Sequence, residues 1–175
     1  MPMDTLKNLF VGQLEELLAS ERHAREVMVK ISKSASAPGL ATALQEQASA
    51  AREHSTRLES ILERYAPSKK SAKSVAVPNE SDACLGLMKD LTKVAENREA
   101  DPHVRDVAML ALAQHFLHRE IAGYGCARAW ARVLGDDRAV SELGRSLDDE
   151  KKADSSLSKL AENVNKLAAA VVVVA

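Results

Sequence analysis

The sequence contains few of the residues that interrupt helices. Its 175 residues include only 7 Gly and 5 Pro, and aromatic residues make up 3% of the chain although 46% of it is hydrophobic. Much of that hydrophobic fraction is Ala and Leu, which favour helix over sheet. The composition therefore predicts an all-α protein, and the length suffices for one domain with a sizeable core.

An excess of charge of one sign is also lacking. The 24 Lys and Arg residues and the 25 Asp and Glu residues are interspersed, and the formal net charge is -1. Because no basic stripe with interleaved aromatic residues is present, the chain has no electrostatic footprint for nucleic acid. We therefore expect no nucleic-acid partner.

Long hydrophobic runs are absent as well. The longest apolar run is LAAAVVVVA at residues 167–175, far shorter than the roughly 20 residues that cross a bilayer. The N-terminal MPMDTLKNLF also lacks a basic region followed by an apolar one, so we expect neither a secretory signal nor a membrane partner. Since the apolar tail has no amphipathic pattern, we assign residues 1–167 to a single domain and residues 168–175 to a tail outside it.

Cysteine is scarce, and the two present lie far apart in the sequence. Cys84 and Cys126 have neither metal-type spacing nor a secreted context. We expect both to be reduced thiols packed as small apolar residues.

Apolar residues recur at helical spacing in four long segments and one short one. They predict long helices over about residues 4–33, 40–65, 102–134 and 136–165, and a short helix over about 81–98. Short turns join the first two long helices and the last two, so each pair is expected to form an antiparallel hairpin. A single long crossover, residues 66–101, links the hairpins. A four-helix bundle with one such crossover, here containing the short fifth helix, has the ferritin-like arrangement.

Few polar side chains occupy core-facing positions, and most of them lie near the middle of a long helix. The set comprises Glu21, Gln47, His54, Glu120, Glu150 and Asp154. An unpaired carboxylate in a dry core costs several kcal/mol and normally takes up a proton. Mid-helix positions of an antiparallel bundle lie at similar depth, and a bound divalent cation compensates converging carboxylates.

We therefore predict a metal-binding cluster in the bundle core. Glu21, Glu120 and Glu150 are the first-choice ligands, and His54 and Asp154 the second choice. Carboxylates combined with imidazole suit iron, manganese or zinc. Two alternatives stay open: these acids pair with arginine, for which Arg57, Arg119, Arg128 and Arg145 are available, or His54 is a hydrogen-bonded core residue and no metal is bound.

Other chemistry has little support in the sequence. His115 and His118 of HFLH lie toward the far side of their helix from Glu120, so we do not expect them in the cluster. No Gly-rich phosphate loop, CxxC or HExxH is present. We therefore assign no catalytic residue and no small-molecule substrate.

The sequence resembles the YciE/YciF-like proteins of the ferritin-like superfamily over about residues 4–166. The stretches that carry the resemblance are LKNLFVGQLEELLASERH, ACLGLMKDL, VRDVAMLALAQHFLHREIAGYGCARAWARVLG and LDDEKKADSSLSKLAENVNK. The resemblance implies a rubrerythrin-type bundle, usually a homodimer, in cytoplasmic proteins linked to stress responses. Glu21, Glu120, Glu150 and Asp154 match acidic positions of the family pattern.

The chain departs from this pattern at three places. Ala50 stands where the family tends to have Glu, Leu117 stands where it tends to have the first Glu of an ExxE pair, and His54 replaces what is often Gln. A dinuclear carboxylate site uses about six protein ligands, whereas four acids and one His remain here. The departures favour a mononuclear site, a weakened site or none.

Two functions follow as hypotheses. In the first, the chain is a stress-associated ferritin-like protein with a reduced carboxylate and histidine metal cluster. In the second, it is a non-catalytic dimeric helical scaffold whose dinuclear site has been lost. Partner binding through Leu85, Leu87 and Met88 of the short helix is a third possibility, although these side chains are also suited to covering one end of the bundle.

Overall fold

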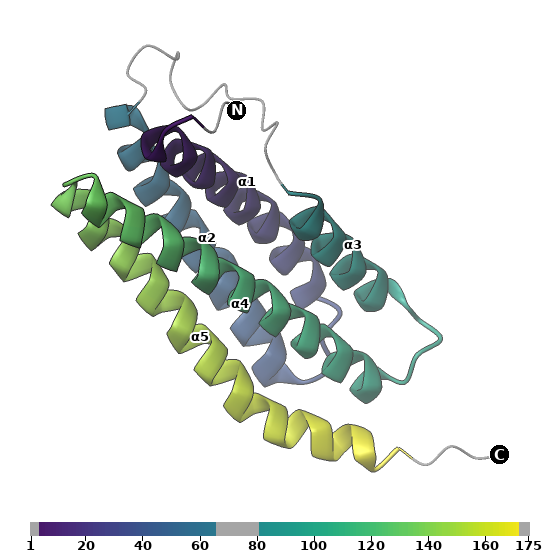
Figure 1. Cartoon of the computed structure of the whole chain (residues 1–175). Helices are drawn as coiled ribbons and strands as arrows, with labels where there is room; N and C mark the ends of the chain where they lie inside the picture. The colour runs from purple at the N-terminus through teal and green to yellow at the C-terminus, as the bar shows by residue number, and fades with distance from the viewer. Residues whose placement is uncertain (1–3, 66–80, 172–175) are drawn as a thin grey trace.

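The computed structural model describes residues 4–65 and 81–171, which form five helices and no strand (Figure 1). These are α1 (Leu6–Ser32), α2 (Pro38–Tyr65), α3 (Asp82–Glu96), α4 (Pro102–Val133) and α5 (Asp137–Ala169). The prediction of an all-α protein is confirmed. The largest difference is at the end of α5, which continues beyond the predicted residue 165 and passes the domain boundary placed at residue 167. Residues 172–175 of the predicted tail lie outside the described residues.

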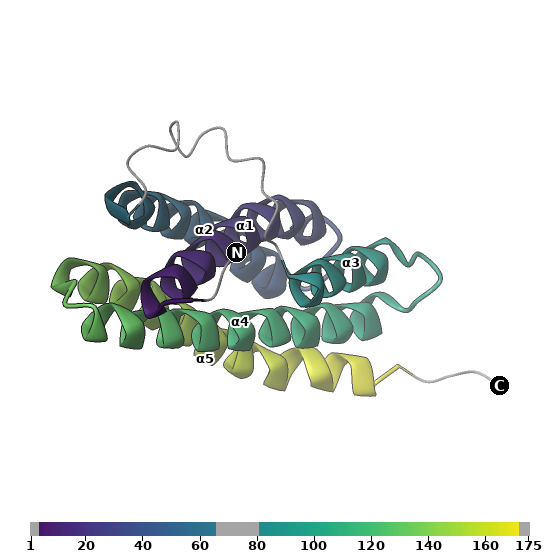
Figure 2. The same cartoon turned by 45° about the horizontal axis from the view of Figure 1, so that its top comes forward.

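The long helices form two antiparallel hairpins. α1 packs along α2 and α4 packs along α5, while the hairpins meet through α1 with α4 and through α2 with α5. The short helix α3 lies against α1 and α4. Figure 2 shows α1, α2 and α3 in one layer and α4 with α5 in the other. The connectivity, with one crossover between two hairpins, is the one that ferritin-like bundles use.

Side-chain caps fix where most of the helices begin. Each cap supplies an acceptor for a backbone N–H that has no partner within the first helical turn. The capping residues are Thr5 for α1, Ser81 for α3, Asp101 for α4 and Asp136 for α5. Pro102 follows its cap in the first turn of α4, where its missing N–H costs no hydrogen bond within the helix.

The start of α2 depends on a carboxylate from another helix. Asp106 of α4 is buried and accepts hydrogen bonds from the backbone amides of Ser36, at 3.0 and 3.1 Å, and of Ala37, at 2.6 Å. Its neighbour Arg105 donates to the carbonyl of Ser34 at 3.1 Å. These bonds hold the turn between α1 and α2 against the first turns of α4, so one end of the bundle is closed by polar contacts.

The apolar core is divided into two clusters by a layer of polar side chains. One cluster includes Met28, Leu44, Met109, Phe116 and Leu157. The other includes Phe10, Leu58, Tyr124, Ala127 and Leu143. On each long helix, a buried polar residue separates the residues of one cluster from those of the other. These residues are Glu21 on α1, His54 on α2, Glu120 on α4 and Glu150 on α5.

The predicted core is wrong at Gln47, which is half-buried, because the neighbouring Ala48 occupies the core position of α2 instead. Cys84 is buried as expected, but Cys126 is exposed and does not pack as a small core residue. Among the described ranges, no helix combines the length and the apolar character needed to cross a bilayer.

Replacing Asp106 by Ala tests the closure of this end of the bundle. The change removes the acceptor for the amides of Ser36 and Ala37, and we expect the free energy of unfolding to fall by about 1–3 kcal/mol. Urea unfolding followed by circular dichroism measures it. Asp90→Ala, at an exposed position of α3, is the matched control. Equal stabilities of the two variants would contradict this role for Asp106.

Candidate metal centre

Three side chains from three helices converge in the polar layer. Glu21, His54 and Glu150 are buried, and each offers one ligand atom within 4.8 Å of the other two. Nδ1 of His54 lies 2.9 Å from Oε1 of Glu21 and 3.1 Å from Oε1 of Glu150. One imidazole nitrogen therefore faces two carboxylates that come from opposite hairpins.

Helical periodicity places these residues at one level of the bundle. On α1, Glu21 follows the buried Leu17 by one turn, and on α5, Glu150 follows the buried Leu147 by three residues. On α2, His54 lies one turn before Leu58. The steps of three and four residues that build the apolar core therefore also bring the three polar side chains inward.

Tyr124 completes the cluster and was not found by the sequence reasoning. Its hydroxyl donates a hydrogen bond of 2.6 Å to Oε1 of Glu21, and its ring lies edge-on to the imidazole of His54 at 5.7 Å between centroids. Helical spacing from Met109, Phe116 and Glu120 points to Gly123 as the core position of this turn. In the structure a Cβ at Gly123 would come within 2.9 Å of Leu17, so this glycine instead allows α1 and α4 to approach closely. The spacing of four residues between Glu120 and Tyr124 places both on one face of the helix, and this was the sequence signal that could have identified Tyr124.

Glu120 lies at the same level but has partners of its own. Its Oε1 accepts hydrogen bonds from Ser20 at 2.7 Å and from Arg119 at 2.6 Å, whereas its buried Oε2 has no hydrogen-bond partner. Arg119 also contacts Glu16 and donates to Ser81 at the start of α3. Burial and the charge of Glu21 raise the pKa of Glu120 well above its usual range. The predicted first-choice ligand Glu120 is thus beside the cluster rather than in it.

Asp154 does not join the cluster. It lies one turn beyond Glu150 on α5, where its Oδ1 accepts from Gln114 at 3.3 Å and lies 3.4 Å from Nε2 of His118. The side chain of Asp154 is 21% exposed. The structure therefore places this second-choice ligand in a partly exposed contact between α4 and α5.

The remaining expectations have mixed outcomes. His115 and His118 are exposed, as their helical face predicted. Leu117 is fully buried in the apolar core, and Ala50 is half-buried beside a surface groove. Asp149 is partly exposed, and its Oδ2 lies 3.4 Å from Nε2 of His54 and accepts a 2.9 Å hydrogen bond from Arg57.

Comparison with known proteins identifies the family. Residues 5–170 match the family described as a domain of unknown function, DUF892. The chain belongs to this family. It is 31% identical over 170 residues to protein YciF of Escherichia coli K12, covering 96% of this chain and 98% of YciF. The predicted resemblance to YciE/YciF-like proteins is confirmed.

Solved structures related to this DUF892 chain share its fold. The crystal structure of the E. coli stress protein YciF matches with a TM-score of 0.81 at 26% identity, covering 94% of this chain and 99% of that one. YcfI from Rhodopseudomonas palustris matches with a TM-score of 0.75 at 28% identity, covering 90% and 97% respectively. The helical bundle is therefore common to these proteins.

Three groups of the cluster in this DUF892 protein have raised pKa values. Burial alone would lower the pKa of His54, but the hydrogen bonds and charges of Glu150 and Glu21 outweigh it and raise that pKa to about 10. Burial raises the pKa of Glu150 to about 7, although contact with His54 opposes the rise. Burial likewise raises the pKa of Tyr124 well above its usual range, so its hydroxyl stays a donor. The imidazolium is therefore the cation between the two carboxylates.

The stability of the metal-free protein should fall as pH rises. The native state holds more protons than the unfolded state, because folding raises the pKa of His54 from 6.5 to about 10 and that of Glu150 from 4.5 to about 7. The contribution of His54 is fully present below its unfolded pKa and is lost as pH passes through about 10. Urea unfolding in the presence of chelator, at a series of pH values from about 7 to about 10, measures the slope.

His54→Gln should flatten this slope, and His115→Gln, at an exposed position, should leave it unchanged. A slope that survives in His54→Gln would show that other groups account for the pH dependence.

Proposed function

We propose that this DUF892 protein binds one divalent metal ion through Glu21, His54 and Glu150, in competition with the proton on His54. The observation that carries the proposal is the convergence of these three buried side chains on one point. Two carboxylates and an imidazole form a ligand set that suits iron, manganese or zinc. Metal binding would displace the imidazole proton, since a ligating histidine must be neutral.

The surroundings of the cluster fit an ion. Oε2 of Glu150 is buried without a hydrogen-bond partner, and an ion would compensate this otherwise costly acceptor. The Tyr124 hydroxyl, which donates to Glu21, would orient that carboxylate as outer groups of metal sites commonly do. His54 Nδ1 and the two carboxylates now lie at hydrogen-bond distances, and they need to separate by only a few tenths of an ångström to surround a tetrahedral ion.

Several features favour a single ion over two. Oε1 of Glu120 is already engaged by Ser20 and Arg119, and the guanidinium beside it opposes a second cation. Leu117 and Ala50 offer no ligand atoms. The dinuclear arrangement that the family resemblance suggested is therefore not our proposal.

The relatives support a role under stress conditions. YciF of E. coli is described as a stress protein, and we propose that this DUF892 protein also acts in a stress response. Iron with open coordination positions would supply redox chemistry, whereas zinc would not. Assembly as a homodimer and a cytoplasmic location remain predictions.

A scaffold without metal is the second candidate. It is favoured by the same His54 Nδ1 contacts, since a protonated imidazole between Glu21 and Glu150, together with a proton on Glu150, compensates the pair without an ion. In that case the polar layer would serve the packing of the helices only. The two candidates differ in metal content, which is directly measurable.

Elemental analysis of protein purified without chelator separates the candidates. We expect about one ion per chain, from iron, manganese or zinc, because the site offers three protein ligands. Glu21→Gln and Glu150→Gln should each weaken binding by at least about 100-fold, since each removes a charged ligand. Asp154→Asn, one turn away on the same helix as Glu150, is the matched control and should bind normally.

Metal far below one ion per chain, with no change in either ligand variant, would support the scaffold and exclude the metal site. Loss of binding in Asp154→Asn would instead show that the ligand set is incorrectly assigned. Circular dichroism of each variant confirms that the bundle has folded.

A further inference from the structure

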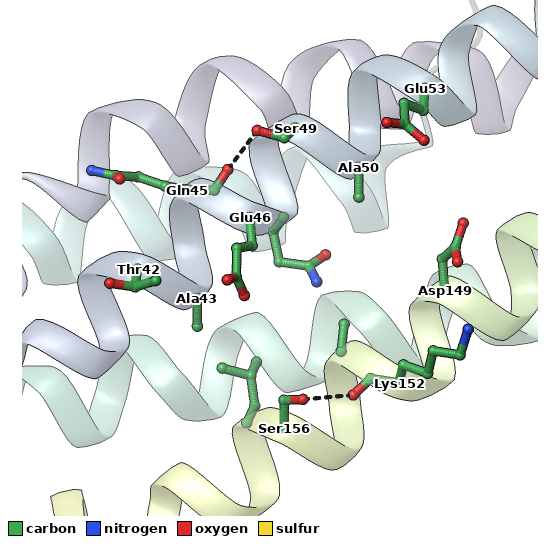
Figure 3. Close-up of a pocket in the computed structure, with 13 residues that line it drawn as sticks. Thr42, Ala43, Gln45, Glu46, Ser49, Ala50, Glu53, Asp149, Lys152 and Ser156 are labelled. Atoms are coloured by element: carbon green, nitrogen blue, oxygen red, sulfur yellow. Dashed lines mark hydrogen bonds between the residues drawn. The ribbon is translucent and has the colours of Figure 1, made fainter.

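A groove runs along the surface between α2 and α5, with a volume of about 550 Å³. Figure 3 shows Ala43, Glu46 and Ala50 of α2 pointing into the space between the helices, and Asp149 of α5 pointing into it from the other side. Small side chains such as Ala50 and Ala153 leave this space open. The groove is therefore a product of the packing of two long helices rather than of a loop.

One residue that lines the groove also contacts the buried cluster. Asp149 lines the groove, and its Oδ2 lies 3.4 Å from Nε2 of His54. The imidazole is fully buried, and at 3.4 Å from Asp149 its Nε2 forms an ion-pair contact that is too long for a good hydrogen bond. His54 therefore directs Nδ1 to the cluster and Nε2 toward Asp149 at the groove.

The charges around the groove favour cations. Three carboxylates line it, those of Glu46, Glu53 and Asp149, against the ammonium of Lys152 and the adjoining guanidinium of Arg57, which leaves an excess of one negative charge. Clefts lined by charge of one sign concentrate counter-ions and raise their association rates. The side of the cluster between α1 and α4 has the opposite character, since α3 covers it and Arg119 lies there against Ser20 and Ser81.

We propose that the groove between α2 and α5 is the route by which a divalent cation reaches the Glu21, His54 and Glu150 cluster, and that Asp149 is the carboxylate it meets before entering. This inference rests on the proposed function, because it requires a metal ion to bind the cluster. It adds a direction of access and a residue that controls the rate of binding rather than the amount bound.

Arg57 forms hydrogen bonds to Asp149 at the groove. Its Nη1 donates to Asp149 at 2.9 Å and to Ser146 at 3.2 Å, and its Nη2 donates to Glu53 at 3.3 Å. The guanidinium thus bridges α2 and α5, and it is paired with the carboxylate that an arriving cation would contact. A cation has to displace Arg57 from Asp149, so removal of Arg57 should speed binding while removal of the Asp149 charge slows it.

Stopped-flow mixing of the chelator-treated full chain with Co²⁺ tests the route. The d–d absorption of bound Co²⁺ gives the rate, and its final amplitude gives the amount bound. We expect Asp149→Asn to bind at least about fivefold more slowly, with a weaker dependence on ionic strength, and Arg57→Gln to bind faster. Both should reach the final amplitude of the unsubstituted protein.

A steric variant tests the route without changing charge. Ala50→Leu fills the groove with a side chain that favours helix and carries no ligand atom, so we expect slower binding with an unchanged amplitude. Ala111→Leu, at an exposed position of α4, is the matched control for bulk. Glu63→Gln, at an exposed position of α2 away from the groove, is the matched control for charge.

The outcomes separate this inference from the proposed function. Normal amplitudes with unchanged rates in Asp149→Asn, Arg57→Gln and Ala50→Leu would overturn the route and leave the metal site standing. An equal slowing in Ala111→Leu and Ala50→Leu would also overturn it. No Co²⁺ signal in the unsubstituted protein would overturn both. A loss of amplitude in Asp149→Asn, with circular dichroism unchanged, would make Asp149 a ligand and would contradict its role as an access residue.

Discussion

The burial of three carboxylates at one level of the bundle is the constraint on which the rest of the structure depends. Glu21, Glu120 and Glu150 lie among apolar side chains, where each charge is costly unless it is compensated. His54 and Arg119 are the cations that contact them. Because a shift of one residue turns a helix position by about 100°, these contacts exist in only one register. The polar layer therefore specifies how the four long helices align. Two uniform apolar clusters alone would specify this alignment less sharply.

The metal site and the scaffold are two ways of meeting this one constraint. A proton on His54 and a divalent ion are alternative cations for the same pair of carboxylates, and each compensates charge that the apolar core would not tolerate. The raised pKa of His54 means that the proton is held firmly, so an ion must bind well enough to release it. If the cluster binds an ion as proposed, the balance between the two states would consequently depend on pH and on the availability of metal.

The sequence was sufficient to predict the helices, their pairing and the level of the polar layer, because these follow from periodicity, caps and loop lengths. It was less informative about which side chains meet. Asp154 follows Glu150 by one turn and shares its general direction, yet it faces Gln114 of α4 instead of His54. A pattern of threes and fours also leaves an ambiguity of one residue, which decided between Gly123 and Tyr124. Such choices depend on how close neighbouring helices approach, and periodicity does not encode that distance.

Ala50 bears both on the number of ligands in the cluster and on the shape of the groove. The resemblance to YciE/YciF-like proteins implies Glu at this position, and here a methyl group lines the groove that Asp149 also lines. A carboxylate at this position would occupy part of the same space. Under the proposed function, Ala50 would therefore supply one ligand atom fewer and leave the proposed path open. A metal site of that kind would suit exchange of its ion rather than retention.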